Sequence, residues 1–267
     1  MLNWGIAGLG DFSSQKAFKR PIEEWVALMP QWMFTTLLGL DALVLPALFI
    51  LPTNGLLLAF AAVLHLIEMK RHYLSYDGAD EMILLCLTAI AFGRLTHSPE
   101  ATAYFIAAEA GLAYFIAGIY KAASPFWKKG LALMLITRTR LFGQQNLSTA
   151  LQQHPRAASA FEFIFVLWES IFVAAMFAPP KVLLAILAVG LVFHLGCAWV
   201  MGLNTFLWAF GATYSCVFFC NQQLRLLLGS SRSNSLSVAL ALAIGITVAI
   251  MTFRIGGRVQ IATTATA

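Results

Sequence analysis

Eight long apolar runs, separated by short polar connections, divide this sequence. A membrane-crossing helix needs roughly 20 mainly apolar residues, and the runs that approach this length are 32–51, 55–69, 82–95, 101–120, 160–178, 182–203, 205–220 and 236–253. The second, third and seventh are short, so tilted or re-entrant segments are an alternative for them. The pattern predicts an all-α, polytopic membrane bundle of about eight spans over residues 32–254.

Composition agrees with an integral membrane protein. The chain is 60% hydrophobic and only 11% charged, with a mean hydropathy of +0.79, far from the usual soluble composition. The net charge of +5 is spread over connections and tails, which does not favour nucleic acid as a partner. Of the 17 Lys and Arg residues, 13 fall in alternate connecting or terminal segments. The positive-inside rule then predicts a multi-pass protein of the cell membrane with both termini in the cytoplasm.

Two stretches outside the runs mix aromatic and basic residues, as segments at a membrane surface do. The first is 12–24, within an N-terminal interfacial segment of residues 1–31. The second is the longest connection, 121–159, which predicts a surface helix with snorkelling cations; a lid over a membrane cavity is the alternative. The Ser-rich stretch 229–235 is typical of a flexible loop, and residues 255–267 are expected to be a tail.

Several ionisable residues fall inside the apolar runs, where each must be paired, hydrated or neutralised. They are Asp41, His65, Glu68, Glu109, Glu162, Glu169 and His194. Glu162 and Glu169 are seven residues apart, so they share one helix face and could line one wall; hydrogen bonds to neighbouring helices are the equally weighted alternative.

Two further groups have simpler interpretations. His65, Glu68 and His72 share a helical side, but no second ligand pair accompanies them, so no metal site is predicted. The stretch 77–81 precedes the third run with acidic residues, which suits a helix N-terminus. A cavity-facing acidic cluster is the rival interpretation of 77–81.

Lys121 ends the fourth run, where an ammonium group is costly. Low dielectric disfavours the charged form of a lysine, so a lysine at the rim of a membrane cavity can become a neutral amine and act as a base. Neither a phosphate-binding loop nor a nucleophile elbow occurs in the sequence, which gives no support to nucleotide-driven transport or serine hydrolase chemistry.

Three blocks of sequence together resemble the horizontally transferred transmembrane domain family, which includes vitamin K-dependent γ-carboxylase. The first is 114–121 with Trp127 and Gly130, and the second is 77–80. The third contains Phe161-Glu162, Trp168-Glu169, Phe193-His194-Leu195-Gly196, Met201, Leu203 and Phe206. The order and spacing of the blocks agree with the family over roughly residues 30–220.

The resemblance implies that Lys121 is a catalytic base acting on a quinol, with Glu169 and His194 as catalytic cavity residues. The blocks also contain Tyr114, Trp127 and Asp80, which become candidate cofactor-binding residues. A quinone or quinol is the implied cofactor. Three departures argue against glutamate carboxylation itself: Tyr120 replaces a lysine, no lumenal domain is present, and charge places the Lys121 end in the cytoplasm.

The residues leave other functions open. Small residues such as Gly111, Ala117, Gly118, Gly196 and Gly202 allow close helix contacts, so a non-catalytic membrane subunit or assembly factor of a larger complex is the main alternative. A maturation or immunity factor for a secreted peptide and a proton-coupled transporter are further alternatives. The expected partners are membrane lipid and other membrane protein subunits.

Overall fold

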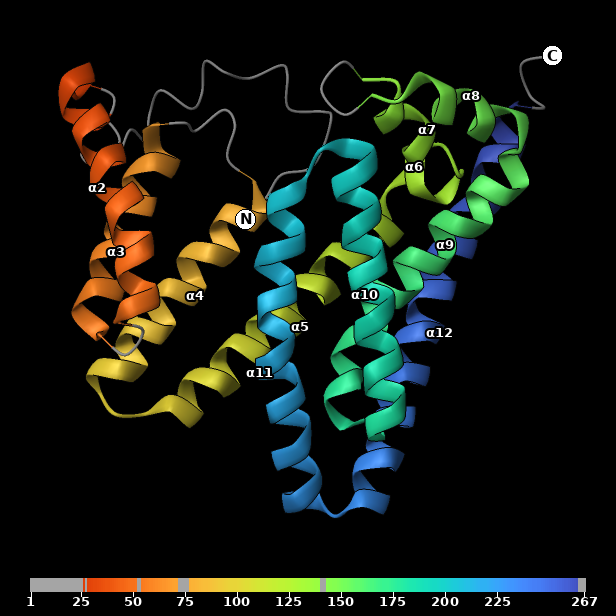
Figure 1. Ribbon diagram of the computed structural model, residues 1–267. Coiled ribbons are helices and arrows are strands. Elements are labelled where there is room, and N and C mark those ends of the chain that lie inside the picture. Colours follow the sequence, from red (N-terminus) through yellow and green to blue (C-terminus); the bar gives the residue numbers. More distant parts are fainter. Residues whose placement is uncertain (1–25, 27, 52–53, 72–76, 140–142, 264–267) are drawn as a thin grey trace. The chain divides into compact units, whose positions relative to one another are not determined.

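Helices joined by short turns make up the part of the chain that the structure describes. The computed structural model describes residue 26 and residues 28–51, 54–71, 77–139 and 143–263, and these contain no strand (Figure 1). The chain divides into two compact units, Met1–Thr102 and Ala103–Ala267. The predicted interfacial stretch 12–24 lies outside the described residues.

Each of the eight apolar runs forms a long helix, although the runs 32–51, 160–178 and 182–203 extend one or two residues past the helix end. These helices are α2 (Gln31–Ile50), α3 (Gly55–Arg71), α4 (Gly78–Leu95), α5 (Pro99–Ala123), α9 (Pro155–Ile171) with its 3₁₀ continuation η3 (Phe172–Phe177), α10 (Pro180–Met201), α11 (Asn204–Leu228) and α12 (Ser230–Thr263). The prediction of an all-helical fold is therefore confirmed. The long connection forms three short helices instead of one: α6 (Pro125–Lys128), α7 (Ala132–Thr137) and α8 (Gln145–Gln153).

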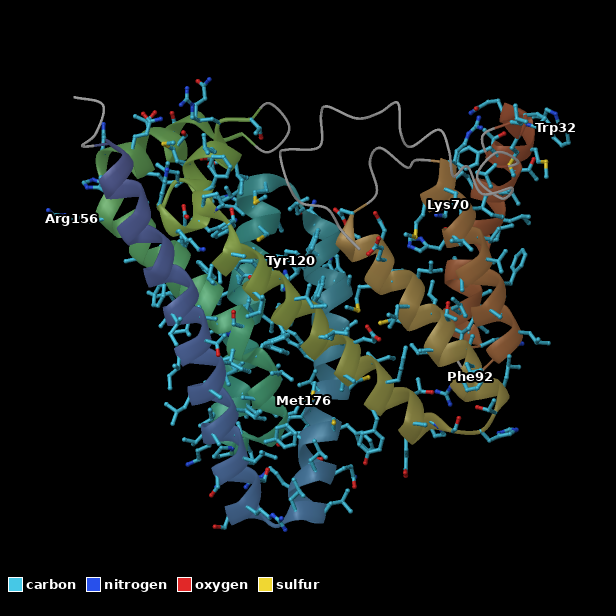
Figure 2. All side chains as sticks on the ribbon, turned by 180° about the vertical axis from the view of Figure 1, so that it is seen from behind. Trp32, Lys70, Phe92, Tyr120, Arg156 and Met176 are labelled. Atoms are coloured by element: carbon cyan, nitrogen blue, oxygen red, sulfur yellow. The ribbon has the colours of Figure 1, made fainter. Side chains whose placement is uncertain are left out.

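Within the described residues, five helical stretches are long and apolar enough to cross a membrane. They are Gln31–Leu48, Pro99–Ala123, Pro155–Phe177, Pro180–Met201 and Ser230–Ile250. Large apolar side chains lie exposed on the long helices, such as Trp32 on α2, one of these five, and Phe92 on α4, which are 71% and 65% exposed (Figure 2). Such surfaces suit lipid better than water. The class of membrane protein is thus supported, whereas the count of eight spans stays a prediction.

In the first unit, α2, α3 and α4 pack through aliphatic side chains. Val44, Ala61 and Leu64 form the buried centre of this contact. The acidic stretch before the third run is a helix cap: the Asp77 carboxylate accepts from Ala79 N at 2.8 Å, and Asp77 N donates to the Asp80 carboxylate at 3.0 Å. This reciprocal pair satisfies two backbone donors that the helix itself leaves open. The cap interpretation of 77–81 is confirmed.

In the second unit, the long helices run back and forth between two ends. One end holds the end of α5, the short helices α6 to α8 and the turn between α10 and α11 (Figure 1). The other holds the turn between η3 and α10 and the turn between α11 and α12 (Figure 1). Helix α11 was the short seventh run in the sequence, yet it extends over 25 residues.

Polar side chains of α11 and α12 satisfy the backbone of η3. A 3₁₀ turn and the following Pro179 leave carbonyl groups without helical partners. The donors are Ser237 to the Ala174 oxygen at 3.0 Å, Asn221 to the Ala175, Met176 and Ala178 oxygens at 2.9 to 3.1 Å, and Ser233 to the Phe177 oxygen at 2.7 Å.

The prediction of a flexible loop over 229–235 is wrong for this reason. Helix α12 begins at Ser230, directly after Gly229 at φ +75°. Ser233 turns inward and binds the Phe177 oxygen of η3, whereas Ser230, Ser231 and Ser235 of the same stretch stay exposed. Helix α12 also extends to Thr263, into the predicted tail.

Candidate functional site

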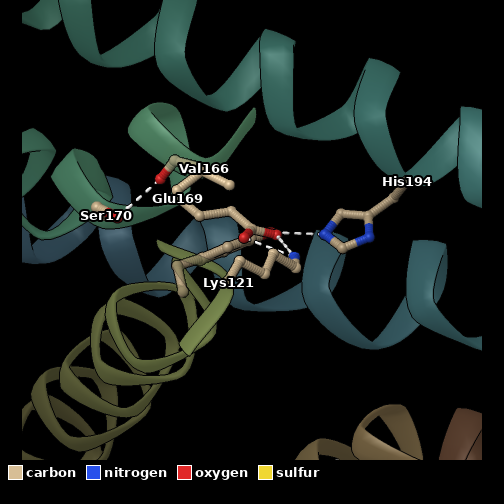
Figure 3. A network of polar contacts seen from close by, with 6 residues as sticks. Lys121, Val166, Glu169, Ser170 and His194 are labelled. Atoms are coloured by element: carbon tan, nitrogen blue, oxygen red, sulfur yellow. Dashed lines mark hydrogen bonds and ion pairs between the residues drawn. The ribbon is translucent and has the colours of Figure 1, made fainter. Parts of the chain in front are cut away.

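Lys121 forms an ion pair with Glu169 inside the second unit. Nζ of Lys121 donates to both carboxylate oxygens, and the bond to Oε2 is 2.6 Å long. The Glu169 side chain is 3% exposed, whereas that of Lys121 is 24% exposed. Figure 3 shows the side chains of Lys121 on α5, Glu169 on α9 and His194 on α10 projecting toward one another. The carboxylate is thus buried behind an amine that still reaches the surface.

Aromatic rings surround this amine. Nζ of Lys121 lies 5.2 Å from the centre of the Trp127 ring and 5.8 Å from that of Phe193. Both distances lie within the range in which the electron-rich face of a ring attracts a cation. Trp127 comes from α6, so the connection after α5 folds back over the lysine at the end of the same helix.

A second hydrogen-bonded group lies beside the ion pair. The Tyr114 hydroxyl is 2.6 Å from Nε2 of His194 and 2.7 Å from the Tyr214 hydroxyl. Tyr114, His194 and Tyr214 come from α5, α10 and α11, and all three are buried. This trio fixes the three helices against one another, because each polar group would be costly if left without a partner in the interior.

Two buried nitrogen atoms of this cluster have no hydrogen-bond partner in the described part of the chain. They are Nδ1 of His194 and Nε1 of Trp168, whose residues are 2% and 7% exposed. The rings of both residues pack against Tyr114 and Phe193. Buried polar atoms are rarely left unsatisfied, so this cluster is suited to take up a small polar group or a water molecule.

Close helix contact brings α5 against α9. A Cβ atom on Gly118 would lie 2.6 Å from the backbone nitrogen of Ser170 and 2.9 Å from its Cα. Ser170 follows Glu169 in the sequence, and Lys121 lies one helical turn after Gly118. The absence of a side chain at Gly118 is therefore what allows the lysine and the carboxylate to meet.

Glu162 anchors the connection near this site. Its residue is fully buried, and its carboxylate accepts from the backbone nitrogen of Leu133 at 2.8 Å and of Ala132 at 3.4 Å, at the start of α7. These are open donors of a helix N-terminus, which favours negative charge. Glu162 and Glu169 share the buried face of α9, as their spacing predicts, but Glu162 holds a short helix whereas Glu169 holds Lys121.

The structure brings most of the predicted site residues together. Lys121, Glu169, His194, Tyr114 and Trp127 all belong to this one cluster. Asp80 belongs to the other unit, where its carboxylate completes the cap of α4.

Tyr214 and Trp168 are members of the cluster that sequence reasoning did not single out as functional. Neither stands near a motif signal of its own: Tyr214 is an aromatic residue in an apolar helix, and Trp168 entered only as part of a family block. Among the described residues, no group of three or more His, Cys, Asp or Glu is placed to hold a metal ion.

Helices long and apolar enough to cross a membrane, with a buried ion pair between two of them, define this chain as a polytopic helical membrane protein. No family model, curated protein or solved structure matches it.

Proposed function

We propose that this protein is a membrane-embedded enzyme in which Lys121 takes a proton from a lipid-soluble quinol or a similar substrate. The observation that carries the proposal is the pairing of a partly exposed amine with a buried carboxylate in an aromatic surround. Resemblance of the Lys121, Glu169 and His194 blocks to the horizontally transferred transmembrane domain family supports the same reaction class.

The ion pair supplies a route to the free base. In a medium of low dielectric, the ammonium and carboxylate can exchange one proton and become a neutral amine and a neutral acid. The Lys121 amine then takes the hydroxyl proton of the substrate, while Glu169 keeps the proton that it received. The products are a quinolate anion and a new ammonium group, which attract each other, and Trp127 and Phe193 stabilise that cation.

The variant Lys121→Arg tests the role of Lys121 as a base separately from its role in the ion pair. A guanidinium keeps the charge and can bind Glu169, but it does not give up its proton in a protein. In lipid nanodiscs, we expect wild-type protein to bind a short-chain naphthoquinol as its anion at neutral pH, visible as the quinolate absorption band. We expect Lys121→Arg to remain folded and to bind the quinol without that band.

The matched control is Lys129→Arg, a conservative change at an exposed lysine of the same connection. It should leave the quinolate band unchanged. A full quinolate signal in Lys121→Arg would exclude the base role. In that case the second function, a non-catalytic membrane subunit, is favoured. Gly196 supports it, because no atom lies within 4 Å of a Cβ atom built on this glycine. Such an open small residue lets a partner helix approach closely.

We also propose eight membrane crossings, with both termini in the cytoplasm of the cell membrane. Each of the eight apolar runs is helical, and α11 runs antiparallel to its neighbours α10 and α12 (Figure 1). Single cysteines placed at Lys129 and at Ser231, in a background without native cysteines, test this topology. An impermeant thiol reagent added to intact cells should label Ser231→Cys and leave Lys129→Cys unlabelled; the reverse pattern would invert the orientation.

A further inference from the structure

An apolar groove lies at the end of the second unit that is opposite Lys121. It has a volume of about 450 Å³ and is lined by Leu228 of α11 and by Arg232, Ser235, Leu236 and Ala239 of α12. Its lining residues flank the turn between α11 and α12, and Figure 1 shows that turn at the lower end of the two helices. The groove takes no part in the ion pair or the tyrosine and histidine group, so the proposed reaction does not account for it.

The groove combines one cation with an apolar path along α12. Arg232 is two residues from the start of α12, so it lies at the rim. Leu242 and Ile246, which are 60% and 58% exposed, follow Ser235 and Ala239 at intervals of seven and therefore continue the same face. From Arg232 to Leu242 the helix rises about 15 Å, which is close to half of a hydrocarbon core of about 30 Å. The path thus has the depth of one leaflet.

The charge of Arg232 is not balanced by the protein around it. No Asp or Glu follows Glu169 in the sequence, so α10, α11 and α12 contain no carboxylate. The neighbouring Arg225 is already bound, donating to Oδ1 of Asn234 at 2.5 Å and to the Ala178 oxygen at 3.4 Å. Arg232 makes no hydrogen bond or ion pair within the described residues and is exposed. Its guanidinium is therefore available to an anion.

We infer that this groove binds one anionic phospholipid, with its phosphate on Arg232 and an acyl chain along Leu236, Ala239 and Leu242. A guanidinium binds phosphate through two parallel hydrogen bonds, which gives orientation as well as attraction. Ser235 also lines the groove, but its hydroxyl donates to the Ser231 oxygen at 3.1 Å, so Arg232 is the group that recognises the phosphate. A cation at the membrane boundary, above an apolar path with the depth of one leaflet, matches the shape and charge of an anionic phospholipid. We expect binding to need both the cation and the apolar path.

Native mass spectrometry of the full chain tests the site with two lipids of equal chain length, phosphatidylglycerol and phosphatidylcholine. Wild-type protein should retain one phosphatidylglycerol in preference to phosphatidylcholine. Arg232→Gln should bind phosphatidylglycerol about fivefold more weakly, the usual effect of one basic residue at an anionic surface. Lys181→Gln removes the same charge from an exposed residue at the same end and should keep the preference.

A second variant separates the apolar half of the site from its charge. Ala239→Trp fills the groove and leaves Arg232 in place, so it should also lose the retained lipid; the circular dichroism of both variants should remain that of the helical wild type. Wild-type retention of phosphatidylglycerol in Arg232→Gln and in Ala239→Trp would overturn the proposal. Equal retention of the two lipids by the wild type would do so as well, because it would show an apolar surface without headgroup recognition.

Discussion

Lys121→Met is expected to lower the free energy of unfolding by about 3–5 kcal/mol, the usual cost of removing one partner of a buried ion pair. Methionine fills a similar volume but offers no charge and no donor. Glu169, which the protein buries almost completely, would then hold an uncompensated charge or would have to take up a proton. Unfolding of the purified protein in mixed micelles, followed by circular dichroism as the fraction of denaturing detergent rises, measures this loss.

The double variant Lys121→Met with Glu169→Gln identifies the cause. It replaces the buried carboxylate by a neutral amide, so it should recover most of the stability that the single variant loses. Lys129→Met, at an exposed lysine of the same connection, should change stability little, because exposed charges contribute little. If the double variant were no more stable than Lys121→Met, the stability lost in Lys121→Met would not come from the unpaired carboxylate of Glu169.

Features that depend on neighbours in the sequence could be predicted from the sequence. The eight helices follow from runs of apolar residues, because a chain in lipid must satisfy its backbone internally. The cap before α4 follows from Asp77 and Asp80, whose side chains reach only local backbone groups. The shared face of Glu162 and Glu169 follows from helical periodicity. In each case the interacting groups are at most two turns apart.

Features that depend on the packing of distant helices could not be predicted in this way. Lys121 and Glu169 are 48 residues apart, and the family resemblance grouped them without indicating that they pair. Tyr214 is 100 residues from Tyr114, in a helix whose many polar residues make it look like a short span. The helical start of α12 is not evident from its serines, because the acceptor of Ser233 is a carbonyl group of η3 that is 56 residues away in the sequence.

The same packing fits the proposed role of Lys121 as a base, because it holds the surrounding cluster in place. Tyr114, His194 and Tyr214 fix α5, α10 and α11 through neutral hydrogen bonds that lie out of reach of solvent. The Lys121 amine lies at the edge of this fixed group and is the only part of the ion pair with substantial exposure. In the proposed reaction, proton transfer to Lys121 would need no rearrangement of the helices, which is the condition for a preorganised site.

Substitution of Gly118 tests whether close contact of α5 and α9 creates the site. Gly118→Ala should destabilise the protein and Gly118→Val should do so by about 3 kcal/mol, the upper range for overpacking, because the new Cβ atom meets the backbone of Ser170 at 2.6 Å. Helix separation should also break the Lys121 to Glu169 pair, so in Gly118→Val the further change Lys121→Met should cost little. Unfolding in mixed micelles measures both effects.

Substitution of Gly196 on α10 by alanine is expected to change the stability of the protein in the opposite direction. Nothing lies within 4 Å of a Cβ atom built there, so Gly196→Ala should stabilise its helix by up to about 1 kcal/mol through the higher helix propensity of alanine. The same substitution thus destabilises at Gly118 and stabilises at Gly196, which separates packing from propensity. If Gly118→Ala instead behaved like Gly196→Ala, α5 and α9 would not be in the contact that brings Lys121 to its carboxylate.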